Sequence, residues 1–60
     1  MKEKAMFIDY REHLDEEKTK FIRKVVDNYE FCVRDGIAYF SSCGQFYQVP
    51  LEDVSQVYTA

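Results

Sequence analysis

Three side chains in this sequence could bind a soft metal ion or act as nucleophile and base: His13, Cys32 and Cys43. A structural zinc site usually takes four ligands in pairs that are close together along the chain. Here ten residues separate the two cysteines, and His13 lies far from both. The sequence therefore predicts no metal site and no cofactor. We expect one buried cysteine, one turn cysteine and a surface histidine.

Cysteine–histidine catalysis would require one of these thiols to lie against His13, with a third group orienting the imidazole. No feature of the sequence brings these residues together. A domain this small also offers little room for a ligand pocket of several hundred cubic ångströms. We therefore expect a protein that is not an enzyme and that has no catalytic residues.

Charged residues are concentrated in the first half of the chain. The acidic run at residues 15–17 follows Glu12 but lacks the spacing and the turn glycine of an EF-hand. One basic group is present, and it consists of Lys18, Lys20, Arg23 and Lys24. Basic residues beside exposed aromatic rings are typical of proteins that bind single-stranded nucleic acid. This group is the candidate site of an alternative function, that of a nucleic-acid-binding regulator.

The composition limits these alternatives. The chain has 60 residues, of which 17% are aromatic, and a net charge of −3. This length suits a single small domain, residues 1–60, whose core is so small that association with itself or with another protein is expected. The mild acidic balance disfavours nucleic acid as a partner.

The sequence also bears on location. No apolar run approaches the roughly 20 residues that span a bilayer, and the start of the chain lacks the long apolar segment of a signal peptide. Two cysteines without an export signal indicate reduced thiols. We expect a cytoplasmic protein that does not associate with membranes.

The first half of the chain has the pattern of an amphipathic helix over residues 10–28. Asp9 and Glu12 are spaced as in a capping box, which marks a helix start. The apolar residues that follow recur at intervals of three, four and seven, as on one face of a helix: Tyr10, Leu14, Phe21, Ile22, Val25, Val26 and Tyr29. A break with Asp15 as a second cap is the alternative. Residues 6–8 fit a strand, a helix start or an apolar arm.

Residues 29–50 have the pattern of two β-hairpins that share a middle strand. Asp35-Gly36 favours a two-residue type I′ turn, because both of its positions need a positive φ and glycine adopts one freely. This turn places Phe31 opposite Phe40 and Val33 opposite Ala38. These residues then share one apolar side, which we assign to the core.

Cys43-Gly44 favours a second two-residue turn, which places Tyr47 opposite Phe40 and extends the apolar side. A three-residue loop would instead direct Phe46 towards the core, because a slip of one residue reverses every side chain. In the favoured register three large side chains lie on the outward side of the sheet: Ile37, Tyr39 and Phe46. An exposed apolar patch of this kind marks an interaction site. The competing expectation is that the N-terminal arm or the C-terminal tail covers it.

Pro50 ends the third strand, and residues 51–58 fit either a short helix or a turn followed by a closing strand. The pattern favours a turn or a 3₁₀ piece and then a short closing segment.

The sequence therefore predicts an α+β fold, in which one N-terminal helix packs on an antiparallel meander of three or four strands. The predicted core contains Leu14, Phe21, Ile22, Val25 and Val26 from the helix and Phe31, Val33, Phe40, Tyr47 and Val49 from the sheet. The predicted function is that of a small protein-interaction module, such as a regulator, an adaptor or a phage- or plasmid-encoded inhibitor. It would act through the aromatic sheet face or by forming a homodimer.

Overall fold

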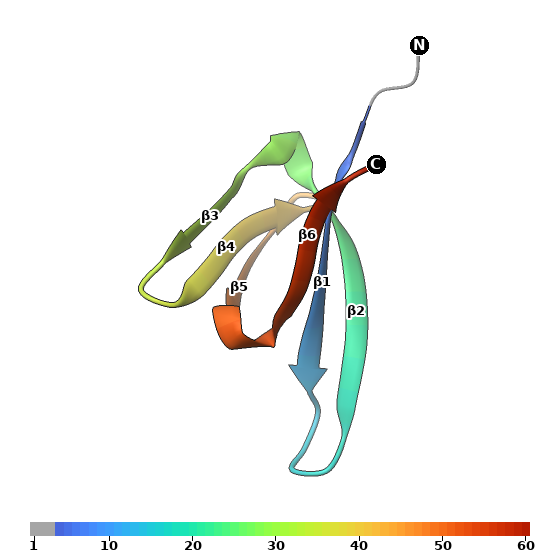
Figure 1. Ribbon diagram of the computed structural model, residues 1–60, viewed down its shortest axis with the longest axis vertical. Coiled ribbons are helices and arrows are strands. Elements are labelled where there is room, and N and C mark those ends of the chain that lie inside the picture. The colour runs from blue at the N-terminus through green and yellow to red at the C-terminus, as the bar shows by residue number, and fades with distance from the viewer. Residues whose placement is uncertain (1–3) are drawn as a thin grey trace.

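The computed structural model describes residues 4–60, which form six strands and two short 3₁₀ turns (Figure 1). The strands are β1 (Met6–His13), β2 (Thr19–Val26), β3 (Phe31–Arg34), β4 (Ile37–Ser42), β5 (Gln45–Pro50) and β6 (Val54–Thr59). The turns are η1 (Asp27–Tyr29), after β2, and η2 (Leu51–Asp53), before β6. The strands make two antiparallel sheets, in the orders β2-β1-β6 and β3-β4-β5.

The prediction of an α+β fold is wrong, because residues 4–60 contain no α-helix. The stretch 10–28, expected to be helical, forms the end of β1, a turn, β2 and most of η1. Asp9 and Glu12 do not form a capping box. They lie in β1, opposite Arg23 and Lys20 of β2. Asp15 does act as a local cap, since its carboxylate accepts hydrogen bonds from two backbone N–H groups, but it does so in the β1–β2 turn.

The helical spacing arises because apolar residues lie on both sides of β2. Ile22 and Val26 point towards the core, whereas Phe21 and Val25 point outward and are 74% and 44% exposed. Lys24 occupies the inward position between Ile22 and Val26, and its ammonium lies 4.7 Å from the centre of the Tyr47 ring. A lysine at this position conceals the alternation that would have indicated a strand.

The two predicted turns of the second sheet are confirmed. Asp35 and Gly36 have φ values of 53° and 73°, and Cys43 and Gly44 have values of 49° and 79°. Both turns are therefore two residues long, with both central residues in the left-handed region, as a type I′ turn requires. The predicted register follows, with Phe40 opposite Phe31 on one side and opposite Tyr47 on the other.

A carboxylate in η1 connects the two sheets. Asp27 Oδ1 accepts a hydrogen bond from the Cys43 backbone N–H at 3.1 Å, and Oδ2 accepts one from Gly44 at 2.9 Å. Asn28 and Tyr29 follow with φ values of 53° and 57°, so the chain reverses sharply before it enters β3. Asp27 therefore holds the β4–β5 turn against the end of β2.

The last segment forms a 3₁₀ turn and then a strand, in agreement with the favoured interpretation. β6 does not extend the meander, however. It pairs with β1, from Met6 opposite Thr59 to Tyr10 opposite Val54, with a bulge that leaves Ser55 as the extra residue. Residues 6–8, which fitted a strand, a helix start or an apolar arm, belong to β1.

Neither 3₁₀ turn within residues 4–60 has the length and apolar character needed to cross a membrane.

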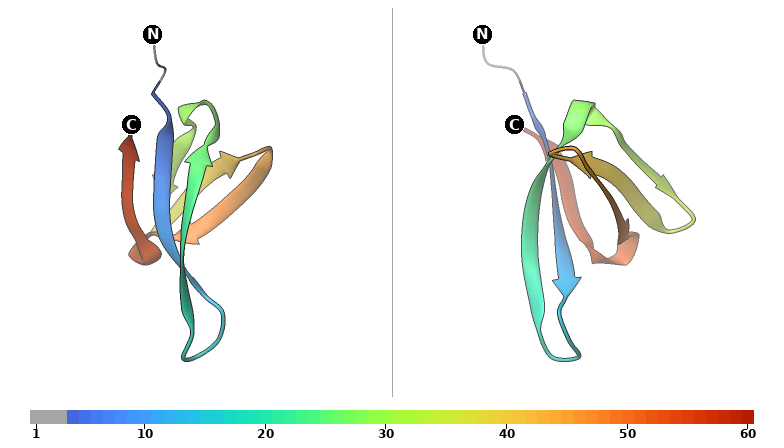
Figure 2. Two further views of the ribbon diagram at one scale, coloured as in Figure 1. Left: turned by 90° about the vertical axis from the view of Figure 1, so that its right-hand side faces the viewer. Right: turned by 180° about the vertical axis from the view of Figure 1, so that it is seen from behind.

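The core lies between the two sheets, whose strands run in different directions (Figure 2). The turn end of the β1–β2 hairpin extends beyond the second sheet. Its buried residues are Ile8, Tyr10, Val26, Phe40 and Val49, with Ile22, Phe31 and Tyr47 packed against them. Four residues expected in the core are exposed instead: Leu14, Phe21, Val25 and Val33. The buried residues of β1 take their place. Ile8 and Tyr10 supply the packing that was expected from a helix.

Candidate functional site

The outward side of the second sheet carries the three residues expected to contact a partner. Ile37 and Tyr39 alternate along β4 with buried residues, so their side chains point away from the core. Phe46 of β5 lies opposite Ser41, which is on the same outward side of β4. The structure thus brings Ile37, Tyr39 and Phe46 onto one surface, which we call the aromatic face.

Stacking interactions order the aromatic face. The rings of Tyr39 and Phe46 stack with their centres 6.2 Å apart and their planes at 27°. The guanidinium of Arg34 lies 5.6 Å from the centre of the Tyr39 ring. Tyr39 therefore contacts both an aromatic ring and a cation on this face.

The aromatic face is partly open within residues 4–60: Phe46 is 63% exposed, whereas Ile37 and Tyr39 are partly buried. Of the two segments that could have folded across it, β1 directs Met6 and Ile8 into the core and β6 pairs with β1 in the other sheet. A shallow depression of about 360 Å³ adjoins the face. It is lined by Tyr39 and Phe46 together with Tyr29, Glu30, Phe31, Cys32, Phe40 and Ser41.

The four residues proposed to bind nucleic acid do not form one surface. Lys18 lies in the β1–β2 turn, and Lys20, Arg23 and Lys24 lie in β2, where side chains alternate. Arg23 points outward, where its Nε donates a hydrogen bond of 2.8 Å to Asp9. Lys24 points inward, over Tyr47. The shared basic surface that a helix would present is therefore missing.

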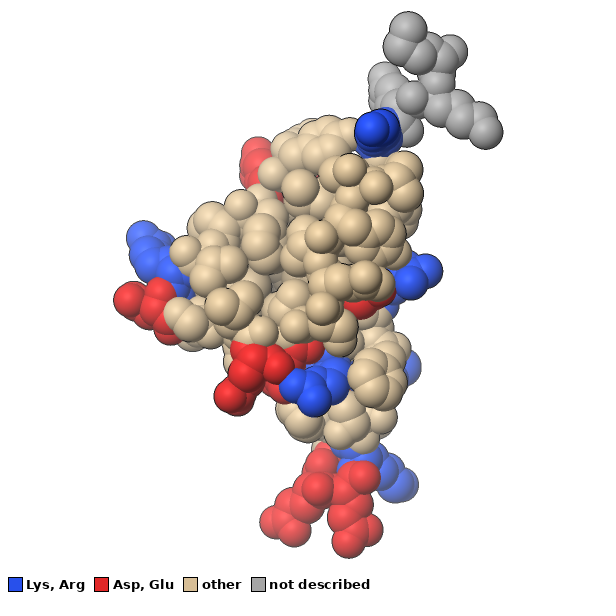
Figure 3. Space-filling view, viewed as in Figure 1, with Lys and Arg blue, Asp and Glu red and all other residues tan. Residues whose placement is uncertain are grey.

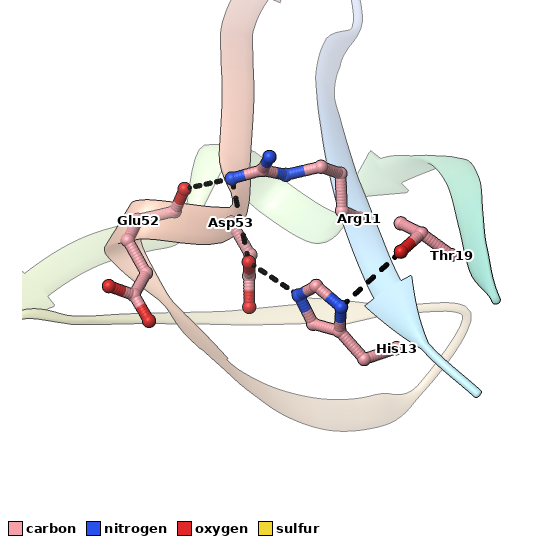
Figure 4. Close-up of polar contacts among 5 residues, drawn as sticks. All are labelled: Arg11, His13, Thr19, Glu52 and Asp53. Carbon is pink, nitrogen blue, oxygen red and sulfur yellow. Dashed lines mark hydrogen bonds and ion pairs between the residues drawn. The ribbon is translucent and has the colours of Figure 1, made fainter. Parts of the chain in front are cut away.

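A polar cluster at the end of β1 was not predicted (Figure 4). Asp53 of η2 is only 8% exposed, and its Oδ1 lies 2.9 Å from His13 Nε2 and 3.6 Å from Arg11. Arg11 also donates a hydrogen bond of 2.6 Å to the backbone carbonyl of Glu52, and Thr19 Oγ1 lies 3.4 Å from His13 Nδ1. The cluster fastens η2 to β1. Because 40 residues separate His13 from Asp53, no local spacing in the sequence indicates it.

The cluster borders a groove of about 490 Å³ between the sheets. Its walls include Tyr10, Ile22, Lys24, Tyr47 and Val49. Burial raises the pKa of Tyr10 above its ordinary value of 10.0, and a hydrogen bond with Tyr47 raises the pKa of Lys24 above 10.5. At neutral pH both groups therefore keep their protons, and the groove presents one ammonium against two phenols.

The histidine and the cysteines lie in different environments. The two ring nitrogens of His13 face Asp53 and Thr19. Cys32 and Cys43 are free thiols and both are exposed, so the expectation that one is buried is wrong. Across residues 4–60 no group of three or more potential ligands is arranged to hold a metal ion.

No family model, curated protein or solved structure matches the chain.

Proposed function

We propose that the chain is a small, non-enzymatic protein-interaction module whose aromatic face binds another protein, in a regulatory, adaptor or inhibitory role. The observation that carries this proposal is the stacked pair of Tyr39 and Phe46, of which Phe46 is 63% exposed. Tyrosine, phenylalanine and arginine are enriched where proteins contact one another, and tyrosine and arginine often supply much of the binding energy.

The surroundings of the face support a protein as the partner. Arg34 is the one charged residue among the outward side chains of β3, β4 and β5. A protein surface that is largely uncharged and contains ordered rings suits the dehydrated centre of a protein interface. The adjoining depression could accept an apolar side chain of the partner.

A photo-crosslinking experiment tests this proposal. A benzophenone amino acid replaces Gln48, which lies opposite Tyr39 on the outward side of β5. In a control chain it replaces Phe21, an exposed ring of the other sheet. Both chains are irradiated in the cells that naturally produce the protein. We expect the first chain alone to give a discrete adduct with a second protein.

Two serine variants show whether that adduct depends on the aromatic face. Phe46→Ser removes the more exposed ring of the face, and Phe21→Ser removes an exposed ring of the other sheet. We expect Phe46→Ser to abolish the adduct at position 48 and Phe21→Ser to leave it unchanged. An adduct that survives Phe46→Ser, or one that contains only copies of this chain, would overturn the proposal.

A further inference from the structure

The strand β6 is an open edge of the first sheet, and its sequence lacks the features that usually protect an edge. In the described part of the chain it pairs with β1 and with no other strand. Residues 54–59 contain no charged residue, no proline and no glycine, and Figure 3 shows an uncharged surface across the middle of the molecule, where β6 lies. Charges, prolines and short strands are what usually prevent an edge from pairing with another chain.

The other edge strands carry at least one of these features. β2 contains Lys20, Arg23 and Lys24, and β3 is only four residues long. β5 ends in Pro50, which has no N–H to donate. Among the described strands, β6 is thus the edge best suited to pairing.

The hydrogen bonds between β1 and β6 identify the free backbone groups of β6. Ala5 and Ala60 exchange two hydrogen bonds, of 2.9 and 3.0 Å, and so form a hydrogen-bonded pair. Along an antiparallel ladder such pairs alternate with pairs that are not hydrogen-bonded. In the observed register the backbone N–H and C=O groups of Val57 and Thr59 therefore point away from β1.

We propose that a second copy of the chain pairs antiparallel with β6, about a two-fold axis at Tyr58, and joins the two first sheets into one six-stranded sheet. Val57 of one copy then lies opposite Thr59 of the other, and their free backbone groups exchange hydrogen bonds. This register avoids the bulge at Ser55 and keeps inward and outward side chains on their own faces.

The side chains favour a second copy over an unrelated peptide. At the axis Tyr58 faces Tyr58 of the other copy, in the type of pair that brings side chains closest together. Tyr58 already stacks on Phe7, with ring centres 5.4 Å apart and planes at 23°. Pairing would therefore create a row of four aromatic rings across the joint. No like charges meet, because residues 54–59 are uncharged.

Sedimentation equilibrium up to millimolar concentration tests the pairing. The wild-type chain should approach twice its monomer mass of 7.2 kDa. Thr59→Pro removes an N–H that points away from β1, so the monomer keeps its ladder while dimerisation weakens by about tenfold or more. Phe46→Ser should leave the mass unchanged, which separates this inference from the proposed function. A wild-type chain that remains monomeric, or a Thr59→Pro chain that dimerises equally well, would refute it.

Disulfide formation tests the register, and it remains informative even if the proline variant does not fold. In a Cys32→Ser, Cys43→Ser background, Tyr58→Cys places one thiol of each copy at the two-fold axis, so air oxidation should give a covalent dimer. Val57→Cys, the control, faces Thr59 of the other copy and should form no covalent dimer. A covalent dimer from Val57→Cys, or none from Tyr58→Cys, would rule out the proposed axis.

Discussion

Among residues 4–60, Asp53 is the one charged residue that is buried. A carboxylate with so little access to water needs partners, and His13 and Arg11 supply them from β1. Both partners remain about half exposed, so their polar groups stay in contact with water. The stability of the cluster therefore depends more on Asp53 than on either partner.

We predict that Asp53→Ala destabilises the fold by about 1–3 kcal/mol, because His13 and Arg11 lose the carboxylate that both contact. His13→Ala should cost less than about 1 kcal/mol, because it removes only a partly solvated contact. Urea unfolding followed by circular dichroism measures both values. Equal losses for the two variants would show that His13 contributes as much as Asp53 to holding η2 against β1.

A second prediction concerns Asp9. Hydrogen bonds from Arg23 and Gln56 hold its pKa below the ordinary value of 3.8. The folded state thus favours the carboxylate, and its contribution to stability is present above the unfolded pKa and is lost as the pH falls through the folded value.

Asp9→Asn should therefore lose less stability than the wild-type chain when the pH is lowered below about 4, because amides do not titrate. Thermal unfolding at a series of pH values from neutral to acidic measures this difference. Asp15→Asn is the control, because it makes the same change at a carboxylate that accepts hydrogen bonds from backbone N–H groups in the β1–β2 turn. If the melting temperatures of the wild-type and Asp9→Asn chains fall equally as the pH is lowered, the prediction is contradicted.

Among the elements, the β4–β5 turn has one unfavourable residue. Cys43 adopts a φ of 49°, in the left-handed region that asparagine tolerates better than other side chains do. Asp27 binds the backbone of this turn and not the thiol, so a new side chain leaves that contact intact.

Cys43→Asn should stabilise the fold by about 0.5–1 kcal/mol, because an Asn-Gly pair is the preferred sequence for a type I′ turn. Gly44→Ala should destabilise it by about 1–2 kcal/mol, because alanine at a φ of 79° is strained although the space around it is open. Differential scanning calorimetry of the two variants provides the test. A lower melting temperature for Cys43→Asn would mean that the thiol makes a contact of its own.

The elements also explain which parts of the structure could be predicted. The second sheet could be predicted, because each of its turns is determined by two adjacent residues and the turn type fixes the register of the strands. The same register placed Ile37, Tyr39 and Phe46 together. The first sheet could not be predicted, because Lys24 at an inward position and Phe21 at an outward one conceal the alternation of a strand. Its pairing also joins β1 to β6 across some 50 residues, for which no local pattern exists.

At the scale of the whole molecule, two small sheets share one core and leave their outer surfaces open. A chain of this size buries a limited share of its apolar surface. Phe46 and Phe21 remain exposed on different sheets, and β6 keeps a free edge. Folding thus uses the inner faces, whereas parts of the outer faces and the β6 edge stay open among residues 4–60.

This division between inner and outer faces predicts that alanine reduces stability strongly at one phenylalanine and weakly at another. Phe40 is 1% exposed and Phe46 is 63% exposed. Phe40→Ala should cost about 3–5 kcal/mol, which is comparable with the whole stability of roughly 3–9 kcal/mol expected for 60 residues. The chain should then be largely unfolded in water. Phe46→Ala should change stability by less than about 1 kcal/mol. Urea titrations at one protein concentration compare them, and a large loss for Phe46→Ala would mean that the aromatic face belongs to the fold and is not free to bind a partner.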